Sequence, residues 1–489
     1  MPANVATSKP PASQGGNQNL IQGFLSTVRG SSDVAIYGRN YLSWTKDSRR
    51  IDRTSTIHSF SIGTGAEIIE SICPAIENAK REVVLVTCFW AKSTSQQRLA
   101  ASILSLAQKA QRDQRLVNVR ICLSSLSLWQ KLTQTSSLNG HIYPSSMWSA
   151  TFGLPRHDDL MEDGNGVQLT IKSIFVRPMS VMHPKCIIID QTRLFLPSCN
   201  ISWEDWFEGM IEMSGGIIDS FLDFHRSFWE GRPNHPLEHA STAATSADVA
   251  PSRPITTLHV ATQERTFSDV HTLFLPSSHH RYPHFRPLPC LAAPPPPATP
   301  LNIFLLQLFA HATHSIHIQT PNLTSPPVLG ALGDALARGV DASIITSTRM
   351  MVIEQIVTAG TITEFCVNGL VRGHRSLFRS WQRRSGGGEV DESAAPRPGR
   401  LSVRYFVPGE GGVAAVGAVK SHLKMTVVDG EVVVLGSGNM DRASWYTSQE
   451  IGVAVFGREI VAMIRGKVDE ALKGRLGREM ADQVEGEAG

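Results

Sequence analysis

The sequence has little excess charge, no paired-cysteine motif and no long apolar run. Lys and Arg number 46 against 43 Asp and Glu, which leaves a formal net charge of +3 over 489 residues. This charge is too small to indicate a dedicated nucleic-acid binder, although local basic patches can still hold an anionic substrate. No stretch reaches the roughly eighteen apolar residues that a spanning helix needs, so we expect any contact with lipid to be peripheral.

The cysteines and the N-terminal residues give an expected location. The cysteines are odd in number, none belongs to a Cys-x-x-Cys pair, and most lie in apolar runs, which predicts reduced, buried thiols. Residues 1–20 lack the apolar core of a secretory signal and the Arg-rich pattern of a transit peptide, so we expect a disordered tail. The predicted location is intracellular, either cytoplasmic or peripheral to a membrane. The cysteines are Cys73, Cys88, Cys122, Cys186, Cys199, Cys290 and Cys366.

Composition divides the chain into two halves. Its length and its 42% hydrophobic content predict two domains or one long pseudo-symmetric domain. A stretch rich in Ser, Thr, Ala and Pro predicts a linker at 236–255, between an N-terminal half at 21–235 and a C-terminal half at 256–480. The polar segment 383–400 cannot build a core, and we expect it to be a flexible insertion.

Each half contains the same series of elements. An apolar β-branched run is followed by a helical stretch and then by a second apolar run. Such alternation predicts an α/β fold whose two pseudo-symmetric halves pack around one shared site. The expected elements are 83–87, 97–110 and 117–121 in the first half, and 316–320, 328–338 and 340–346 in the second.

A more specific motif then occurs once in each half. The first copy has His183 and Lys185, then Asp190, then Ser198 and Asn200 after a second apolar run. Residues two apart on a strand share a face, so the imidazole and the ammonium are expected to project together. A Ser-x-Asn pair at a strand end can donate to the oxygens of an anion. The second copy, at the same spacing, consists of His422, Lys424, Asp429, Ser437 and Asn439.

Two glutamates follow the motifs at similar distances. Glu212 lies twelve residues after Asn200, and Glu450 lies eleven residues after Asn439. A carboxylate at such a position can fix the tautomer of a histidine by accepting its second N–H.

The paired groups suit attack on a phosphodiester. One neutral imidazole attacks phosphorus, the other protonates the leaving alcohol, and the lysines and asparagines stabilise charge on the remaining oxygens. This chemistry predicts no metal and no cofactor. A single His-x-Lys pair is more often a surface accident, but two copies with matching spacing in matching halves favour the functional interpretation.

At these residues the sequence resembles the phospholipase D superfamily, whose members carry two His-x-Lys-x4-Asp motifs followed by a Ser/Gly-x-Asn segment. The second copy, with Gly436 to Asp441 and Glu450, looks especially similar to bacterial cardiolipin synthases. The first copy departs at Pro197, where the family usually has Gly, but it keeps Ser198 and Asn200.

The resemblance implies a role for each residue. His183 would be the nucleophile and His422 the general acid, and an acid from the opposite half would orient each ring. Glu450 would therefore orient His183, and Glu212 would orient His422. The motif aspartates Asp190 and Asp429 would be structural, Ser198 and Ser437 would support phosphate binding, and Lys185, Lys424, Asn200 and Asn439 would complete the catalytic set.

The favoured function is a phosphodiesterase or phosphatidyltransferase that acts on phospholipids through a phosphohistidine, of the phospholipase D or cardiolipin synthase-like type. The alternative is a nuclease or DNA phosphodiesterase of the same superfamily, in which nucleic acid would be the partner. Under either interpretation one chain supplies a complete site, so a monomer would suffice. The sequence leaves open the headgroup, the acceptor alcohol, the membrane and the choice between hydrolysis and transfer.

Overall fold

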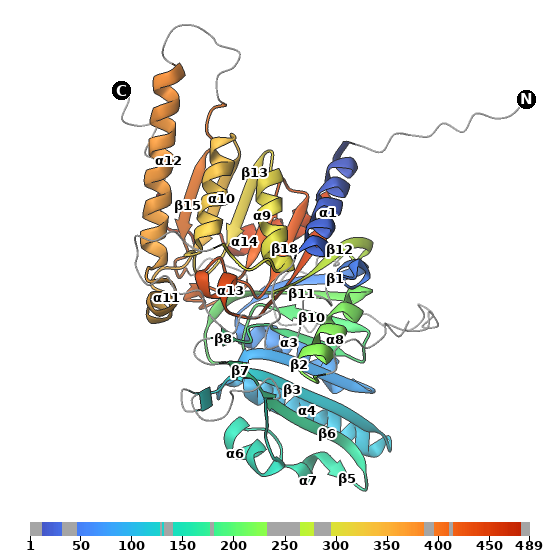
Figure 1. Cartoon of the computed structure of the whole chain (residues 1–489). Coiled ribbons are helices and arrows are strands. Elements are labelled where there is room, and N and C mark those ends of the chain that lie inside the picture. Colours follow the sequence, from blue (N-terminus) through green and yellow to red (C-terminus); the bar gives the residue numbers. More distant parts are fainter. Residues whose placement is uncertain are drawn as a thin grey trace, which may run out of the picture.

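The computed structural model in Figure 1 describes residues 12–31, 46–127, 130–131, 140–176, 180–231, 265–277, 295–385, 396–409 and 414–480. The predicted linker 236–255, residues 1–11 of the predicted tail and residues 386–395 of the predicted insertion lie outside these ranges. The tail prediction is wrong for residues 12–20. They belong to helix α1, Ala12–Gly30, which buries apolar side chains such as Phe24 against the second half.

One mixed sheet of seventeen strands runs through both halves of the described structure, and fourteen of them form a continuous series. Neighbouring strands pair in the order β6, β3, β2, β9, β10, β11, β1, β12, β19, β18, β17, β13, β14, β15. The strands of the first half are β1 Asp52–Gly63, β2 Glu82–Phe89, β3 Leu116–Ser125, β6 Asn165–Ser173, β9 Cys186–Ile189, β10 Arg193–Pro197 and β11 Trp206–Gly215. Those of the second are β12 Phe267–Ser277, β13 Ser315–Gln319, β14 Asp341–Thr346, β15 Leu401–Tyr405, β17 Met425–Val428, β18 Val432–Gly436 and β19 Glu450–Phe456.

The order of the strands is the same on both sides of the central β1–β12 pair. Reading outwards, each side has four antiparallel pairings and ends in three strands that are parallel to one another. Parallel strands need helical crossovers on the sheet faces, and the helices that the sequence predicted, 97–110 and 328–338, occupy these positions. The expected α/β fold is confirmed.

Both faces of the sheet are covered by helices (Figure 1). On β2, Val83 and Leu85 join the core beneath α3 and α4, whereas Val84 and Val86 join the central core that includes α8 and α14. A strand buried on both faces reads as a continuous apolar run, which is why these strands could be recognised in the sequence. The principal helices are α3 Gly65–Glu77, α4 Thr94–Arg112, α8 Ile217–Phe228, α9 Pro300–His311, α10 Pro326–Ala337, α11 Val352–Ala359, α12 Thr363–Ser385, α13 Arg442–Tyr446 and α14 Arg458–Ala471.

Short elements complete the described structure. They are η1 Ser48–Arg50, β4 His141–Ile142, η2 Ser145–Met147, α6 Trp148–Phe152, α7 His157–Leu160, β5 Met161–Glu162, β7 Phe175–Val176, β8 Ser180–Val181 and β16 Lys420–Ser421. Of the predicted insertion 383–400, residues 383–385 form the last turn of α12. Within the described ranges, no helix combines the length and the apolarity needed to cross a membrane.

The cysteine prediction agrees with the structure for most of the thiols that it describes. Cys73, Cys122, Cys186 and Cys199 are free and buried, whereas Cys88 and Cys366 are free and only partly buried. Cys290 lies outside the described residues.

Candidate active site

Each His-x-Lys segment is hydrogen-bonded to the opposite half of the chain. The backbone N–H of His183 donates to the carbonyl of Gln449 over 2.9 Å, and that of His422 donates to the carbonyl of Phe207 over 2.9 Å. The segments were predicted to lie on strands, but they are extended stretches directly before β9 and β17. This position frees them from the sheet ladder, so their backbones can pair across the boundary between the halves.

A glutamate from the opposite half contacts each imidazole. Nδ1 of His183 lies 2.8 Å from Oε2 and 2.9 Å from Oε1 of Glu450, which begins β19. Nδ1 of His422 lies 2.7 Å from Oε1 of Glu208, near the start of β11. A carboxylate accepts the Nδ1–H, and this leaves Nε2 of each ring unprotonated and available to a substrate.

The prediction that Glu212 orients His422 is wrong. Its carboxylate accepts from Arg193 instead, at 3.0 Å from Nε and 2.5 Å from Nη2. Glu208 contacts His422 instead. It lies four residues before Glu212 and on the same face of β11.

Unequal loop lengths explain why sequence spacing selected the wrong glutamate. The chain from Asn439 to Glu450 contains helix α13, Arg442–Tyr446, and spans eleven residues. From Asn200 to Glu208 it spans eight, without a helix. The usable signal was the position of the acid at the start of an apolar strand, which Glu208 and Glu450 share.

The two serines support these glutamates. Oγ of Ser437 donates to Oε2 of Glu450 over 2.5 Å and accepts from the N–H of Ile451 over 3.0 Å. Oγ of Ser198 likewise donates to Glu208 and accepts from the N–H of Gly209 over 2.9 Å. The hydroxyls are therefore directed at the carboxylates that hold the histidines, whereas the sequence had assigned them to phosphate binding.

Both motif lysines are buried beside their histidines. Nζ of Lys185 donates to the carbonyl of His183 over 3.0 Å, and Nζ of Lys424 donates to that of His422 over 2.6 Å. The two residues are 1% and 4% exposed. An ammonium has three N–H donors, so each lysine retains donors for the oxygens of an anion.

The asparagines hold polar atoms that the described structure leaves unpartnered. Oδ1 of Asn200 and Oδ1 of Asn439 are buried and form no hydrogen bond among the described residues. Nδ2 of Asn439 donates to Asp441 over 2.9 Å. Buried amide groups without a full set of partners are consistent with a site that binds a polar ligand.

The motif aspartates anchor the turn at the end of the strand that follows each His-x-Lys segment. Asp190 and Asp429 adopt left-handed backbone conformations, with φ of 52° and 53°, in the turns after β9 and β17. Each carboxylate accepts three backbone N–H groups at or just before the start of the neighbouring antiparallel strand, β2 or β13. The donors are Lys80, Arg81 and Glu82 for Asp190 at 2.6–3.0 Å, and Thr313, His314 and Ser315 for Asp429 at 2.8–2.9 Å.

Burial disfavours positive charge on both histidines and on Lys424. It lowers the pKa of His183, against the opposing charge of Glu450, and lowers the pKa of His422 to about 3, against that of Glu208. Burial also lowers the pKa of Lys424 to about 7. The two rings differ in access, because the His183 side chain is 14% exposed and that of His422 only 3%. The ring of Trp206 lies 4.7 Å from that of His422.

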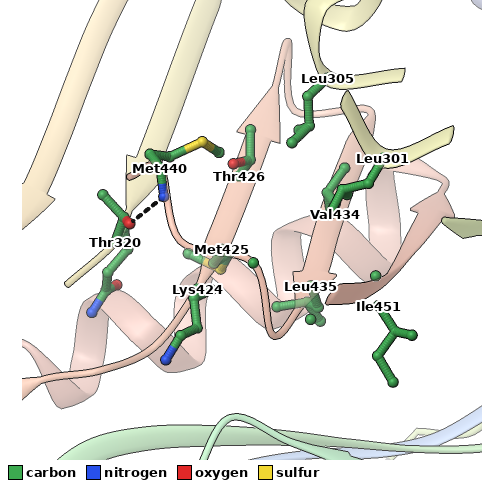
Figure 2. A pocket seen from close by; sticks show the side chains of 14 residues that line it. Leu301, Leu305, Thr320, Lys424, Met425, Thr426, Val434, Leu435, Met440 and Ile451 are labelled. Atoms are coloured by element: carbon green, nitrogen blue, oxygen red, sulfur yellow. Dashed lines mark hydrogen bonds between the residues drawn. The ribbon is translucent and has the colours of Figure 1, made fainter. Parts of the chain in front are cut away.

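A small apolar cavity lies behind Lys424 (Figure 2). Leu301, Leu305 and Met440 are among its lining residues, and the ammonium of Lys424 points away from them. Its volume is about 20 Å³, which holds roughly one water molecule and no substrate group. The cavity therefore adjoins the apolar stem of Lys424 and does not accommodate the phosphodiester.

The described residues contain no cluster of three or more His, Cys, Asp and Glu side chains arranged to hold a metal ion. The absence of a metal requirement remains a prediction from the chemistry of the paired histidines.

Comparison with known proteins gives one family match, which lies within the second half. Residues 305–471 match the family model described as the phospholipase D-like domain of cardiolipin synthase. No curated protein matches the chain.

Among solved structures, phosphatidylserine synthase of Haemophilus influenzae Rd KW20 has a TM-score of 0.53 at 14% identity, with 95% of this chain and 92% of that chain covered. The phospholipase D family member Nuc of Salmonella typhimurium has a TM-score of 0.24 at 17% identity, with 36% of this chain and 91% of that chain covered. Residues 305–471 are therefore similar to the phospholipase D-like domain of cardiolipin synthase, and the chain as a whole shares the fold of that phosphatidylserine synthase.

Proposed function

We propose that this protein is a phosphodiesterase or phosphatidyltransferase that acts on phospholipids through a phosphohistidine intermediate. One observation carries the proposal: a glutamate from the opposite half holds each imidazole at Nδ1, and, in addition to burial, the lysine of each motif lowers the pKa of the histidine in the other motif. Two buried ammonium groups accompany them. This set supplies a nucleophile, a proton donor and cationic stabilisation, which are the groups that substitution at a phosphodiester needs.

In the first step, the Nε2 lone pair of His183 attacks phosphorus. The bond from phosphorus to the leaving oxygen breaks, and protonated His422 donates its proton to that oxygen, so the alcohol departs neutral. Lys185 and Lys424 stabilise the negative charge that spreads over the remaining oxygens. The products are the free alcohol and a phosphatidyl group bound to His183.

In the second step, water or an acceptor alcohol attacks the same phosphorus. His422, now neutral, takes the proton of the attacking O–H, the P–N bond breaks, and its electron pair returns to His183. Water gives hydrolysis, and an alcohol gives transfer of the phosphatidyl group. One covalent intermediate therefore serves both reactions.

The comparisons support a lipid substrate. The family model that matches 305–471 is described by cardiolipin synthase, and the structure that covers 95% of this chain is a phosphatidylserine synthase. Both names refer to phospholipid chemistry. Activity on nucleic acid, the alternative from the sequence, is a distinguishable outcome of the test below.

The test is to incubate the purified full chain with labelled phosphatidylglycerol, phosphatidylcholine or single-stranded DNA, with and without a primary alcohol. We expect headgroup release from a phospholipid, a new phosphatidyl alcohol when alcohol is present, and no product from His183→Ala. Cleavage of DNA without turnover of lipid would overturn the proposal.

Because two imidazoles and two ammonium groups supply the charge stabilisation, the activity is expected to survive chelation with EDTA. Complete loss that one divalent ion restores would contradict this mechanism.

A further inference from the structure

Large apolar side chains gather on one exposed segment beside the site. Among the described residues, ten large hydrophobic side chains are exposed, and five of them lie between positions 351 and 365. Single exposed apolar residues are common on soluble proteins, but a contiguous group indicates an interaction surface. The five are Met351 at 40%, Ile353 at 80%, Ile356 at 54%, Val357 at 54% and Phe365 at 67% exposure.

The spacing of these residues places them on a defined face. Ile353, Ile356 and Val357 stand at i, i+3 and i+4 on α11, so they form one apolar stripe. Gln355 is the buried residue of this helix, and its side chain accepts from both the N–H and the hydroxyl of Thr363 over 2.8 Å. The helix is thus held by its inner face while its apolar face is turned outward.

This helix is linked to the candidate active site. Arg442, three residues after Asn439, donates to the carbonyl of Thr358 over 3.2 Å, and α11 packs against α13. Figure 1 shows α11 at one end of α12 and next to α13. The apolar stripe therefore lies near the loop that carries one of the proposed catalytic asparagines.

A basic stripe continues from the apolar one. Helix α12 contains five arginines and a single acid, Glu364. Phe365, Arg372, Arg379 and Arg383 follow one another at intervals of seven, seven and four residues, which places them on one helix face. All four are exposed. One face of α12 is thus apolar where it meets α11 and cationic along the rest of its length.

A groove beside this face is likewise lined by both apolar and cationic side chains. It has a volume of about 640 Å³, and its lining includes Phe365, Val371, Arg372, Arg375 and Arg478. Its carboxylate, Glu479, is paired with Arg404 at 2.7 Å. Among the described residues, no carboxylate pairs with Arg372, Arg375 or Arg478, so guanidinium groups next to an aromatic ring provide donors for an anionic headgroup and apolar contact for the acyl region.

We propose that the apolar face of α11 and the basic face of α12 form a docking surface for an anionic phospholipid bilayer. Ile353, Ile356, Val357 and Phe365 enter the boundary between headgroups and acyl chains, and the arginines contact anionic headgroups. Apolar burial and attraction to an anionic surface together give interfacial binding. The inference rests on the proposed function, since docking would bring a phospholipid substrate to the site.

The test measures binding and catalysis separately. The full chain is sedimented with vesicles of phosphatidylcholine alone or mixed with phosphatidylglycerol, and turnover of soluble bis(4-nitrophenyl) phosphate is followed in parallel. The double variant Ile353→Ser, Ile356→Ser should bind mixed vesicles at least tenfold more weakly, with unchanged turnover of the soluble diester. Ile142→Ser, a site 62% exposed on the opposite half, is the matched control and should bind as the parent chain does.

The arginines are tested in the same way. Arg372→Gln with Arg379→Gln should weaken binding to mixed vesicles severalfold and reduce its salt dependence, while Arg112→Gln, exposed on α4, should change neither. Wild-type binding by the Ile353, Ile356 variant would overturn the proposal. The proposal would also be overturned if the parent chain does not bind vesicles but dimerises through this face. Vesicle binding without lipid turnover would refute the proposed function and leave the docking surface intact.

Discussion

The two histidines have the same partners but different surroundings. Each ring donates Nδ1–H to a glutamate that a serine supports, and each backbone carbonyl accepts from the following lysine. The His183 side chain is nevertheless 14% exposed, whereas that of His422 is 3% exposed and lies against Trp206. The same set of hydrogen bonds therefore surrounds two histidines that differ in access. His183 is open to a bulky diester, and His422 is enclosed.

This difference supports the roles that we propose for the two histidines. The accessible ring, His183, is suited to bond to phosphorus, since its lowered pKa keeps Nε2 free of a proton near neutral pH. The enclosed ring, His422, gains its proton when an anion enters, because a nearby negative charge raises the pKa of an imidazole. Identical side chains in unequal environments can thus perform different steps.

Breaking either histidine should have the largest effect. His183→Ala removes the atom that bonds to phosphorus, so turnover should vanish with every substrate. His422→Asn should slow release of an alkoxide by about 10²–10⁴-fold, because the proton donor is lost. Release of 4-nitrophenol needs little protonation, so His422→Asn should recover most of the rate of the first step with a 4-nitrophenyl ester. A burst of 4-nitrophenol after rapid mixing would show this recovery. Equal losses for both leaving groups would contradict the assignment.

Glutamate substitutions should have intermediate effects and sharpen the comparison between the halves. Glu208→Gln and Glu450→Gln should each lower kcat roughly 10–100-fold. A carboxylate can only accept the Nδ1–H, whereas an amide can also donate to Nδ1 and so fixes the tautomer of the histidine less firmly. Glu212→Gln is the matched control on the same face of β11 and should retain nearly full kcat. A larger loss for Glu212→Gln than for Glu208→Gln would restore the pairing that the sequence suggested.

Much of this site was accessible from the sequence. The duplicated His-x-Lys spacing located both imidazoles and both lysines, and continuous apolar runs marked the strands that directly follow them, because those strands are buried on both faces. Glu208 was missed because α13 lengthens one of two corresponding loops, and sequence spacing cannot register such an insertion. Helix α1 was missed because the apolar side chains that it buries, such as Phe24, pack on the distant second half.

The aspartates should affect folding about equally in the two halves. Asp190→Ala and Asp429→Ala each leave three backbone N–H groups without their acceptor, which should lower the free energy of unfolding by about 2 kcal/mol. Urea denaturation measures this change, and Asp158→Ala, with a side chain 99% exposed, is the matched control. A loss confined to one half would show that the two anchors are not equivalent.

The smallest expected effect is the uptake of a proton by Lys424 when an anion binds. Burial lowers the pKa of Lys424 to about 7, and a bound anion should raise that pKa, so anion binding near neutral pH should be accompanied by proton uptake. Sulfate keeps its charge near pH 7, so calorimetric titration in buffers of different ionisation enthalpy reports the protein's own uptake. Lys424→Met should reduce the uptake. An undiminished value would place the proton elsewhere.

Trapping the covalent intermediate tests the central claim most directly. The parent chain and the variants His183→Ala and His422→Asn are mixed with a labelled 4-nitrophenyl phosphodiester, quenched and mapped by peptide. His422→Asn should accumulate the label on His183, since the base that activates water or alcohol is absent, and His183→Ala should carry none. Label on His422, or label in His183→Ala and not in His422→Asn, would contradict the assignment of the two histidines.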